Sequence, residues 1–213
     1  MRLEELYRLY EERKPIIKER LLEFEMVWRD GDDLRIFEEL AFCIFTAGAS
    51  ARMGLRCIDS IRPILITGTE EEIFERIKSI HIYPRARARY IVQTREHLKD
   101  KIGLRLKEVI GSFQDRLKRR DFLAMDKGIK GIGFKEASHF LRNIGFKGYA
   151  ILDRHIMKTL RDFGIVDSDN PPSSRSSYIE IEEKMRRFSE EIRIDMDELD
   201  LLLWSARTGE VLK

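Results

Sequence analysis

The chain has 213 residues, of which 37% are charged and 43% hydrophobic, and its formal net charge is +2. This composition is typical of a globular protein and excludes a disordered chain, while so small a net charge does not by itself indicate a nucleic-acid partner. No apolar run approaches the roughly 20 residues that a membrane-spanning helix needs, and the first residues are charged and helix-patterned instead of forming a secretory signal. We therefore expect a soluble cytoplasmic protein with no membrane partner.

Helical periodicity runs through almost the whole sequence. Apolar residues recur at helical spacing from residue 3 to residue 22, where Pro15 predicts a break or a kink. After a turn at 30–33, the dense apolar run 34–45 gives way to small residues at 46–51, which indicates a helix end beside something that needs room. Further helices are expected up to residue 61 and at 69–80, 84–99, 102–117, 122–126, 136–143, 177–191 and 195–207. No alternating pattern is long enough for a sheet, so the sequence predicts an all-α fold.

The clearest interruption is the polar, proline-containing segment 167–174, which is either a loop within one lobe or a linker between lobes. We expect two helical lobes with an active-site cleft between them. One lobe comprises residues 34–117 and the other residues 118–213, against which the N-terminal helical segment 1–33 packs. Together these parts would form one functional unit.

The sequence contains only two cysteines, Cys43 and Cys57, in apolar or mixed surroundings. Two cysteines cannot supply a disulfide framework, a four-cysteine zinc site or a four-cysteine iron–sulfur cluster. No other cluster of metal-ligating side chains is visible in the sequence. We expect two buried thiols, no cofactor and no metal held by side chains.

The segment Gly131-Ile132-Gly133-Phe134-Lys135 lies between two helix-patterned stretches and predicts a helix–hairpin–helix. Glycines let a backbone turn tightly with its amides outward, and amides at a helix N-terminus bind phosphate. A Gly-x-Gly alone would fit a plain turn between helices equally well, but the flanking helices and the capping Gly145 favour the larger motif. Gly131 and Gly133 are therefore candidates for holding a DNA phosphate through their backbone amides.

The run Gly133–Asn143, followed by Asp153-Arg154-His155-Ile156, resembles the helix–hairpin–helix DNA glycosylase superfamily. It is most similar to the type-2 8-oxoguanine DNA glycosylase/lyases of archaea and some thermophilic bacteria, and the similarity extends from residue 40 to the last residue. The resemblance implies that Lys135 is the nucleophile and Asp153 its acidic partner. It also implies that carbonyls of the hairpin can hold a monovalent cation. The lack of further cysteines excludes the iron–sulfur loop of endonuclease III-like relatives and weakens an assignment to pyrimidine damage.

The chemistry of these two side chains agrees with that implication. Breaking an N-glycosidic bond creates a sugar cation, which a carboxylate such as Asp153 stabilises and an uncharged amine such as Lys135 captures at C1′. The resulting Schiff base permits β-elimination of the 3′ phosphate. Two simpler roles stay open: Asp153 can cap the helix that follows it, and Lys135 can contact a phosphate without chemistry.

The resemblance implies further contacts with DNA. His155 would contact a phosphate, whereas we expect His139 to pack inside the protein. Trp204 and Lys213 reproduce the family's ending, in which a tryptophan precedes a last lysine whose terminal carboxylate contacts the oxidised purine; a frayed tail is the alternative. Tyr83 is a further candidate for holding the extruded base.

The sequence leaves two parts of the DNA contact unassigned. Larger relatives carry an Asn or Gln wedge after the helix at 40–45, where this chain has Gly48-Ala49-Ser50. Basic side chains that either contact phosphates or form an ordinary solvated face are Arg85, Arg87, Arg89, Arg95, Arg116, Lys118, Arg119 and Arg120.

Taken together, the motif and the resemblance predict a monomeric, bifunctional DNA base-excision repair enzyme. It would be a DNA N-glycosylase and AP lyase that acts on double-stranded DNA containing 8-oxoguanine. A glycosylase for another damaged base is the first alternative. The second is a helix–hairpin–helix module that binds DNA without chemistry, in which case Lys135→Gln would have no activity to remove.

Overall fold

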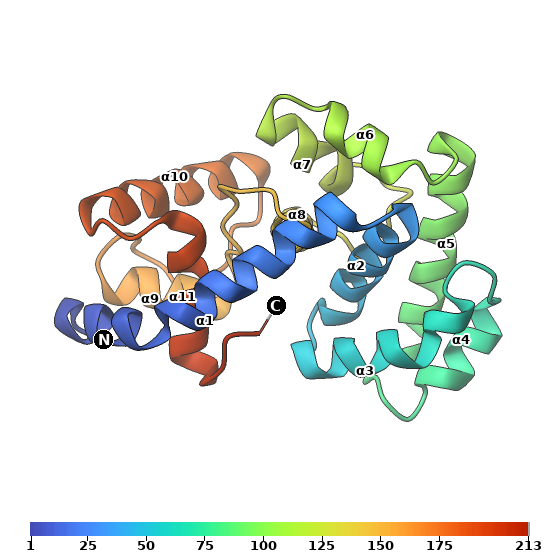
Figure 1. Cartoon of the computed structure of the whole chain (residues 1–213), viewed down its shortest axis with the longest axis horizontal. Helices are drawn as coiled ribbons and strands as arrows, with labels where there is room; N and C mark the ends of the chain where they lie inside the picture. Colours follow the sequence, from blue (N-terminus) through green and yellow to red (C-terminus); the bar gives the residue numbers. More distant parts are fainter. Residues whose placement is uncertain (213) are drawn as a thin grey trace. The chain divides into compact units, whose positions relative to one another are not determined.

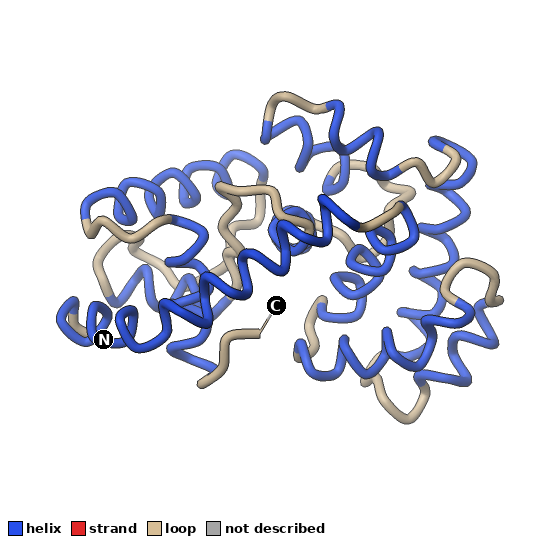
Figure 2. The backbone as a smooth tube through the Cα atoms, in the orientation of Figure 1, coloured by secondary structure: helices blue, strands red, loops and turns tan. Residues whose placement is uncertain are grey.

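Helices account for the regular structure of the computed structural model, which describes residues 1–212, and no strand occurs among those residues (Figures 1 and 2). The all-α prediction is confirmed. The helices are α1 (Leu3–Asp30), α2 (Asp33–Thr46), α3 (Ala51–Ile61), the 3-10 helix η1 (Arg62–Ile64), α4 (Glu70–Ile77), α5 (Pro84–Ile102), α6 (Leu106–Ser112), α7 (Arg116–Ala124), α8 (Phe134–Asn143), α9 (Arg154–Asp162), α10 (Arg175–Glu191) and α11 (Met196–Thr208). None of these helices is both long and apolar enough to cross a membrane.

Side-chain caps define the start of most helices. The oxygen of each capping residue accepts a hydrogen bond from an amide of the first turn, which has no partner within the helix. The capping residues are Asp32, Ser50, Thr69, Asp115, Asp153, Ser174 and Asp195. The positions where the helices begin are therefore largely set by local sequence.

The chain divides into two compact units. The middle unit is Met26–Phe140, and the terminal unit is Met1–Glu25 together with the chain from Leu141 onward. These boundaries differ from the lobes expected at 34–117 and 118–213. The middle unit extends to Phe140, so the hairpin and Lys135 belong to it and not to the terminal unit. The segment 167–174 lies wholly within the terminal unit, so it is a loop and not a linker between units.

The middle unit is built around α2, which packs against α3, α5 and α6. Ten of its residues are buried, among them Phe37, Leu40 and Phe42. Gly54 lets α3 approach closely, because a Cβ there would lie 2.6 Å from the Thr46 side chain and 3.0 Å from the Phe42 ring. The end of α2 therefore does adjoin a close helix contact, as the change to small residues indicates.

In the terminal unit, α11 packs against both α9 and α10. Its buried residues include Leu199, Leu201, Leu202 and Leu203, which form the apolar centre of this unit. Two carboxylates of the same helix, Asp197 and Asp200, are buried as well.

Two expected features of the helices differ in the structure. Of the break or kink expected at Pro15, the structure excludes the break, because the first helix continues from Leu3 to Asp30. Pro15 lies on the exposed side, where water can satisfy the carbonyl that loses its helical partner. The expected helix 102–117 is interrupted instead, since Gly103 and Leu104 both take a positive φ and end α5.

Candidate functional site

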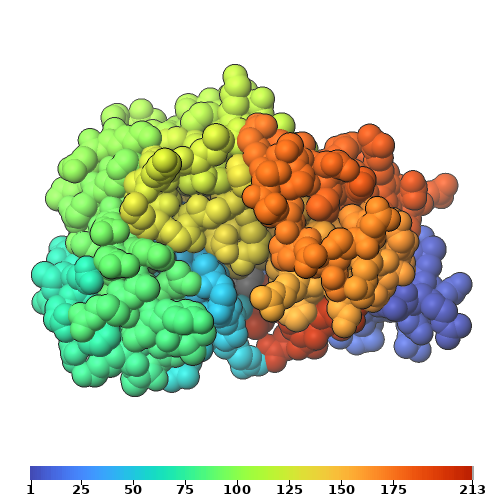
Figure 3. Space-filling view, turned by 180° about the vertical axis from the view of Figure 1, so that it is seen from behind, coloured from blue at the N-terminus to red at the C-terminus, as the bar shows by residue number. Residues whose placement is uncertain are grey.

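The turn between α7 and α8 forms the expected hairpin, which is yellow in Figure 3 and reaches the surface. Gly131 has a φ of +74°, and a Cβ there would lie 3.0 Å from the Tyr90 ring. Both facts call for glycine at this position. Gly133 has no positive φ, and a Cβ there would meet only the Glu136 carboxylate at 3.5 Å. The two glycines thus differ: Gly131 shapes the turn, while Gly133 keeps its outer side open.

One face of α5 holds the start of the hairpin through Asp126. His97 Nε2 lies 2.9 Å from Asp126 Oδ2, and Lys101 Nζ donates to the same oxygen at 2.7 Å. The other oxygen of Asp126 accepts a hydrogen bond from the Gly128 amide at 2.8 Å. Although burial opposes it, the hydrogen bonds from Lys101, His97 and Gly128 lower the pKa of Asp126 to about 2. Asp126 is therefore an ionised brace between α5 and the turn.

The same face of α5 continues along the hairpin. Thr94 Oγ1 accepts a hydrogen bond from the Lys130 amide at 2.8 Å, and Tyr90 lies against Gly131. The contact residues Tyr90, Thr94 and His97 are spaced by one helical turn, so they share one side of the helix. Because successive positions of α5 meet successive positions of the turn, the hairpin is held along its whole length.

Lys135 lies on the first turn of α8, where its side chain is 28% exposed. Its Nζ forms an ion pair with Glu136 Oε1 at 2.8 Å. Arg87 of α5 is also in electrostatic contact with Glu136, and burial lowers the pKa of this arginine. The amine is therefore partly accessible to solvent and is held by a neighbouring carboxylate.

Asp153 is the N-cap of α9. Its Oδ1 accepts hydrogen bonds from the amides of His155 at 2.8 Å and Ile156 at 2.9 Å. The capping role left open by the sequence is therefore confirmed. Both bonds use the same oxygen, so Oδ2 has no hydrogen-bond partner within residues 1–212 and remains available to another group.

The remaining candidates lie in different environments. His155 is exposed at the start of α9, and His139 is buried with its ring edge-on to a phenylalanine, as expected for a packing residue. Trp204 is partly buried on α11. Tyr83 is 56% exposed and precedes α5 directly. Lys213 lies outside the described residues.

The structure separates the basic side chains into internal and exposed ones. Arg95 is buried and donates to the carbonyls of Leu65 and Gly68, and Arg120 is buried against Ser138. Further arginines with partners inside their own unit are Arg85 with Glu71, Arg87 with the Ala47 carbonyl, and Arg119 with the carbonyls of Ile110 and Phe113. Arg89 and Lys118 are exposed, and so is Arg85 despite its pairing with Glu71. The buried Arg95 and Arg120 therefore do not belong to a solvated basic face.

Both cysteines are buried thiols, as predicted, and burial raises the pKa of Cys57 to about 11. Among residues 1–212, no three His, Cys, Asp or Glu side chains gather in a way that could hold a metal ion.

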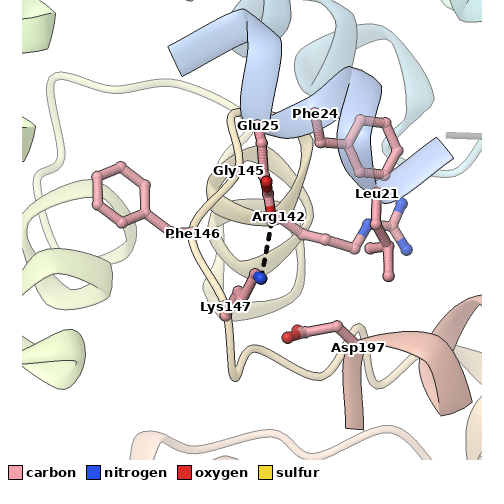
Figure 4. Close-up of a pocket in the computed structure, with 8 residues that line it drawn as sticks. All are labelled: Leu21, Phe24, Glu25, Arg142, Gly145, Phe146, Lys147 and Asp197. Atoms are coloured by element: carbon pink, nitrogen blue, oxygen red, sulfur yellow. Dashed lines mark ion pairs between the residues drawn. The ribbon is translucent and has the colours of Figure 1, made fainter. Parts of the chain in front are cut away.

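A small cavity in the terminal unit does not qualify as a substrate pocket. Its volume is about 10 Å³, which is room for one water molecule at most. Among the residues around it, Lys147 forms an ion pair with Glu25 at 2.8 Å, and Arg142 and Asp197 line its sides (Figure 4). The cavity belongs to the packing of α1 against the end of α8.

Comparison with known proteins adds evidence over nearly the whole chain. A family model described as 8-oxoguanine DNA glycosylase matches residues 17–194. A protein of Korarchaeum cryptofilum named 8-oxoguanine DNA glycosylase/AP lyase is 41% identical over 94% of this chain and 91% of its own length. A protein of the same name from Methanocaldococcus jannaschii is 40% identical over 94% of this chain and 93% of its own length.

Solved structures show the same relation in three dimensions. The Methanocaldococcus jannaschii 8-oxoguanine glycosylase/lyase, crystallised with a 15mer DNA containing 8-oxoguanine, superimposes with a TM-score of 0.88 at 37% identity. That likeness covers 99% of this chain and 100% of the other. The 8-oxoguanine DNA glycosylase of Thermotoga maritima also gives a TM-score of 0.88, at 35% identity, over 99% of this chain and 98% of its own.

Proposed function

Because the chain belongs to the 8-oxoguanine DNA glycosylase family, we propose that it removes 8-oxoguanine from double-stranded DNA and then cleaves the strand at the abasic site. The observation that carries this proposal is the likeness to glycosylase/lyases along almost the full chain. A hairpin with an open glycine and a partly exposed lysine supports it from the geometry. The activity would lie in the cytoplasm and need only one copy of the chain.

Lys135 is the proposed nucleophile. Its Nζ must leave the ion pair with Glu136 and lose a proton before it can attack. The bond between C1′ and the base then breaks, with the base leaving as an anion that takes up a proton, and a bond between C1′ and Nζ forms. Loss of a proton from Nζ and cleavage of the C1′–O4′ bond, with O4′ taking up a proton, then open the sugar ring and give the Schiff base. Removal of a C2′ proton expels the 3′ phosphate by β-elimination, and water finally releases the lysine.

Asp153 is the proposed stabiliser of the sugar cation. Because capping α9 uses only Oδ1, the carboxylate can keep its helix in place and present Oδ2 to a developing positive charge. A carboxylate held by two amides is also fixed in orientation, which lowers the cost of arranging it during the reaction.

The DNA itself would be held by separate groups. We assign phosphate contacts to the amides of Gly131 and Gly133 and to His155, and contacts with the base to Trp204, Tyr83 and Lys213. The exposed positions of Gly133, His155 and Tyr83 support these assignments. We propose that the reaction needs no cofactor, and that a monovalent cation held by hairpin carbonyls would serve only to bind phosphate.

Borohydride trapping tests the function directly. The wild-type protein is incubated with duplexes that carry 8-oxoguanine, an abasic site or no lesion, and borohydride reduces any Schiff base to a stable adduct. We expect adducts with the first two duplexes, none in Lys135→Gln, and normal adducts in Lys184→Gln, a control for an exposed lysine paired with Glu180 on α10. Trapping on the abasic duplex alone would indicate another damaged base, and DNA binding without any adduct would indicate a monofunctional enzyme or a non-catalytic module.

A further inference from the structure

The segment Gly148–Leu152, which leads directly into Asp153, is irregular yet buried. Ala150 and Leu152 are fully inaccessible, and Ile151 is 7% exposed. Buried backbone outside a helix cannot bond to water, so its amides and carbonyls need other partners. The structure supplies these partners as side chains of α10 and α11, all within the terminal unit.

Three carboxylates accept hydrogen bonds from this segment. Asp197 accepts from the Gly148 amide at 2.9 and 3.2 Å, Glu182 from the Ala150 amide at 3.1 Å, and Asp200 from the Ile151 amide at 2.9 Å. All three carboxylates are buried, and Asp200 also forms an ion pair with buried Arg142 at 2.8 Å. Charged groups placed this deep are costly, so their use on one short segment indicates that its position matters.

The fourth partner is Tyr178 of α10, which is 2% exposed. Its hydroxyl donates to the Ala150 carbonyl at 2.7 Å and accepts from the Leu152 amide at 3.3 Å. Leu152 is the last residue before Asp153. The amide of Asp153 itself donates to the Ile151 carbonyl at 2.7 Å. The position of Gly148–Leu152, called the anchored segment below, therefore determines the position of Asp153, the cap of α9.

We propose that Tyr178, acting with the buried carboxylates of α10 and α11, is a positioning residue that fixes Asp153 for stabilising the sugar cation. This inference rests on the proposed function. It assigns Tyr178 no contact with DNA; the hydroxyl acts only through the backbone that carries Asp153. Small displacements of a reacting group matter, because an error of about 1 Å can cost about 100-fold in rate.

Tyr178→Phe is the mildest test, since it removes one hydroxyl and keeps the ring that fills the core. It leaves the Ala150 carbonyl and the Leu152 amide without their partner, so the backbone next to Asp153 is free to shift. We expect base excision under single-turnover conditions to slow by about 10- to 100-fold. Schiff-base formation on a ready-made abasic site should change little, because no N-glycosidic bond has to break there.

Tyr10→Phe is the matched control. Tyr10 lies in the terminal unit too, and its hydroxyl donates to Glu198, whose carboxylate makes no hydrogen bond with the anchored segment Gly148–Leu152. This variant also loses a hydrogen-bonded hydroxyl but should keep the ratio of excision to abasic-site cleavage. A general loss of stability would lower both activities together, so the ratio separates positioning from folding.

Asp153→Asn tests whether Tyr178 acts through Asp153. If Tyr178 acts through Asp153, the double variant Tyr178→Phe/Asp153→Asn should excise the base as slowly as Asp153→Asn alone. Independent, multiplying losses in the double variant, or an unchanged ratio in Tyr178→Phe, would overturn this inference. Failure of the wild-type protein to excise 8-oxoguanine would instead overturn the proposed function, so the two failures are distinct.

Discussion

The contact between Gly128 and His97 tests how α5 holds the hairpin. A Cβ on Gly128 would lie 2.3 Å from three atoms of the His97 ring, which is far inside van der Waals contact. Gly128 has no positive φ, so Gly128→Ala brings no strain of that kind, and its main effect is to expel the ring. Since the His97 side chain is 33% exposed, the ring can move into solvent while the protein stays folded.

The size of the effect follows from the bond that is lost. Expelling the ring breaks its 2.9 Å hydrogen bond with Asp126, and bonds to charged groups contribute about 1.5–3 kcal/mol. Exchange of glycine for alanine restores about 0.4–1 kcal/mol by restricting the unfolded chain. We expect Gly128→Ala to lower the free energy of unfolding by about 1–2 kcal/mol, which corresponds to roughly 3–6 °C in Tm.

A double-mutant cycle with His97→Ala supplies the decisive comparison. His97→Ala loses the same hydrogen bond, so it should cost about 1.5–3 kcal/mol as well. Once the ring is absent, the methyl of Gly128→Ala meets no obstacle, and the double variant should be no less stable than His97→Ala. Urea unfolding with an unchanged m-value measures all three variants. Additive losses in the double variant would refute the displacement of the ring.

Two further predictions concern Asp197 and the hairpin glycines. Burial raises the pKa of Asp197 from 3.8 to about 6. Protonated Asp197 therefore contributes fully to the stability of the folded protein below about pH 4, and this contribution is lost as the pH rises through about 6. Asp197→Asn should therefore flatten the Tm-against-pH curve and gain up to about 3 kcal/mol above pH 7; parallel curves would contradict this. Gly131→Ala, at φ +74° and close to Tyr90, should lose about 1–2 kcal/mol of stability, whereas Gly133→Ala should keep its stability and bind DNA more weakly in a gel-shift assay. Equal stability losses would contradict the difference between the glycines.

The sequence predicts the helices and the hairpin well because both depend on local signals. Helical periodicity gives the apolar faces, and capping residues such as Asp153 mark where helices begin. The run 102–117 shows the limit of periodicity: its apolar spacing continues, but Gly103 and Leu104 adopt positive φ and stop the helix. Glycine gives a visible signal for such a turn, whereas leucine gives none.

Contacts between segments distant in sequence could not be predicted in the same way. Tyr178 and Ala150 are 28 residues apart, and nothing in either local pattern indicates that a hydroxyl will meet a carbonyl. Asp200 does leave a trace, because a carboxylate within the apolar run of α11 requires a buried partner. The sequence therefore indicates that Asp200 has a buried partner. It does not indicate that the partners are Arg142 and the Ile151 amide, which the folded structure shows.

The burial of both thiols bears on the conditions in which a repair enzyme for oxidised guanine would operate. Peroxide attacks the thiolate form of cysteine far more readily than the thiol, and it needs access to the sulfur. Cys43 and Cys57 are both at 0% exposure, and the raised pKa of Cys57 keeps its sulfur protonated at neutral pH. The oxidants that damage guanine therefore find no reactive cysteine on this protein. Cysteine oxidation should not inactivate it under the conditions in which 8-oxoguanine forms.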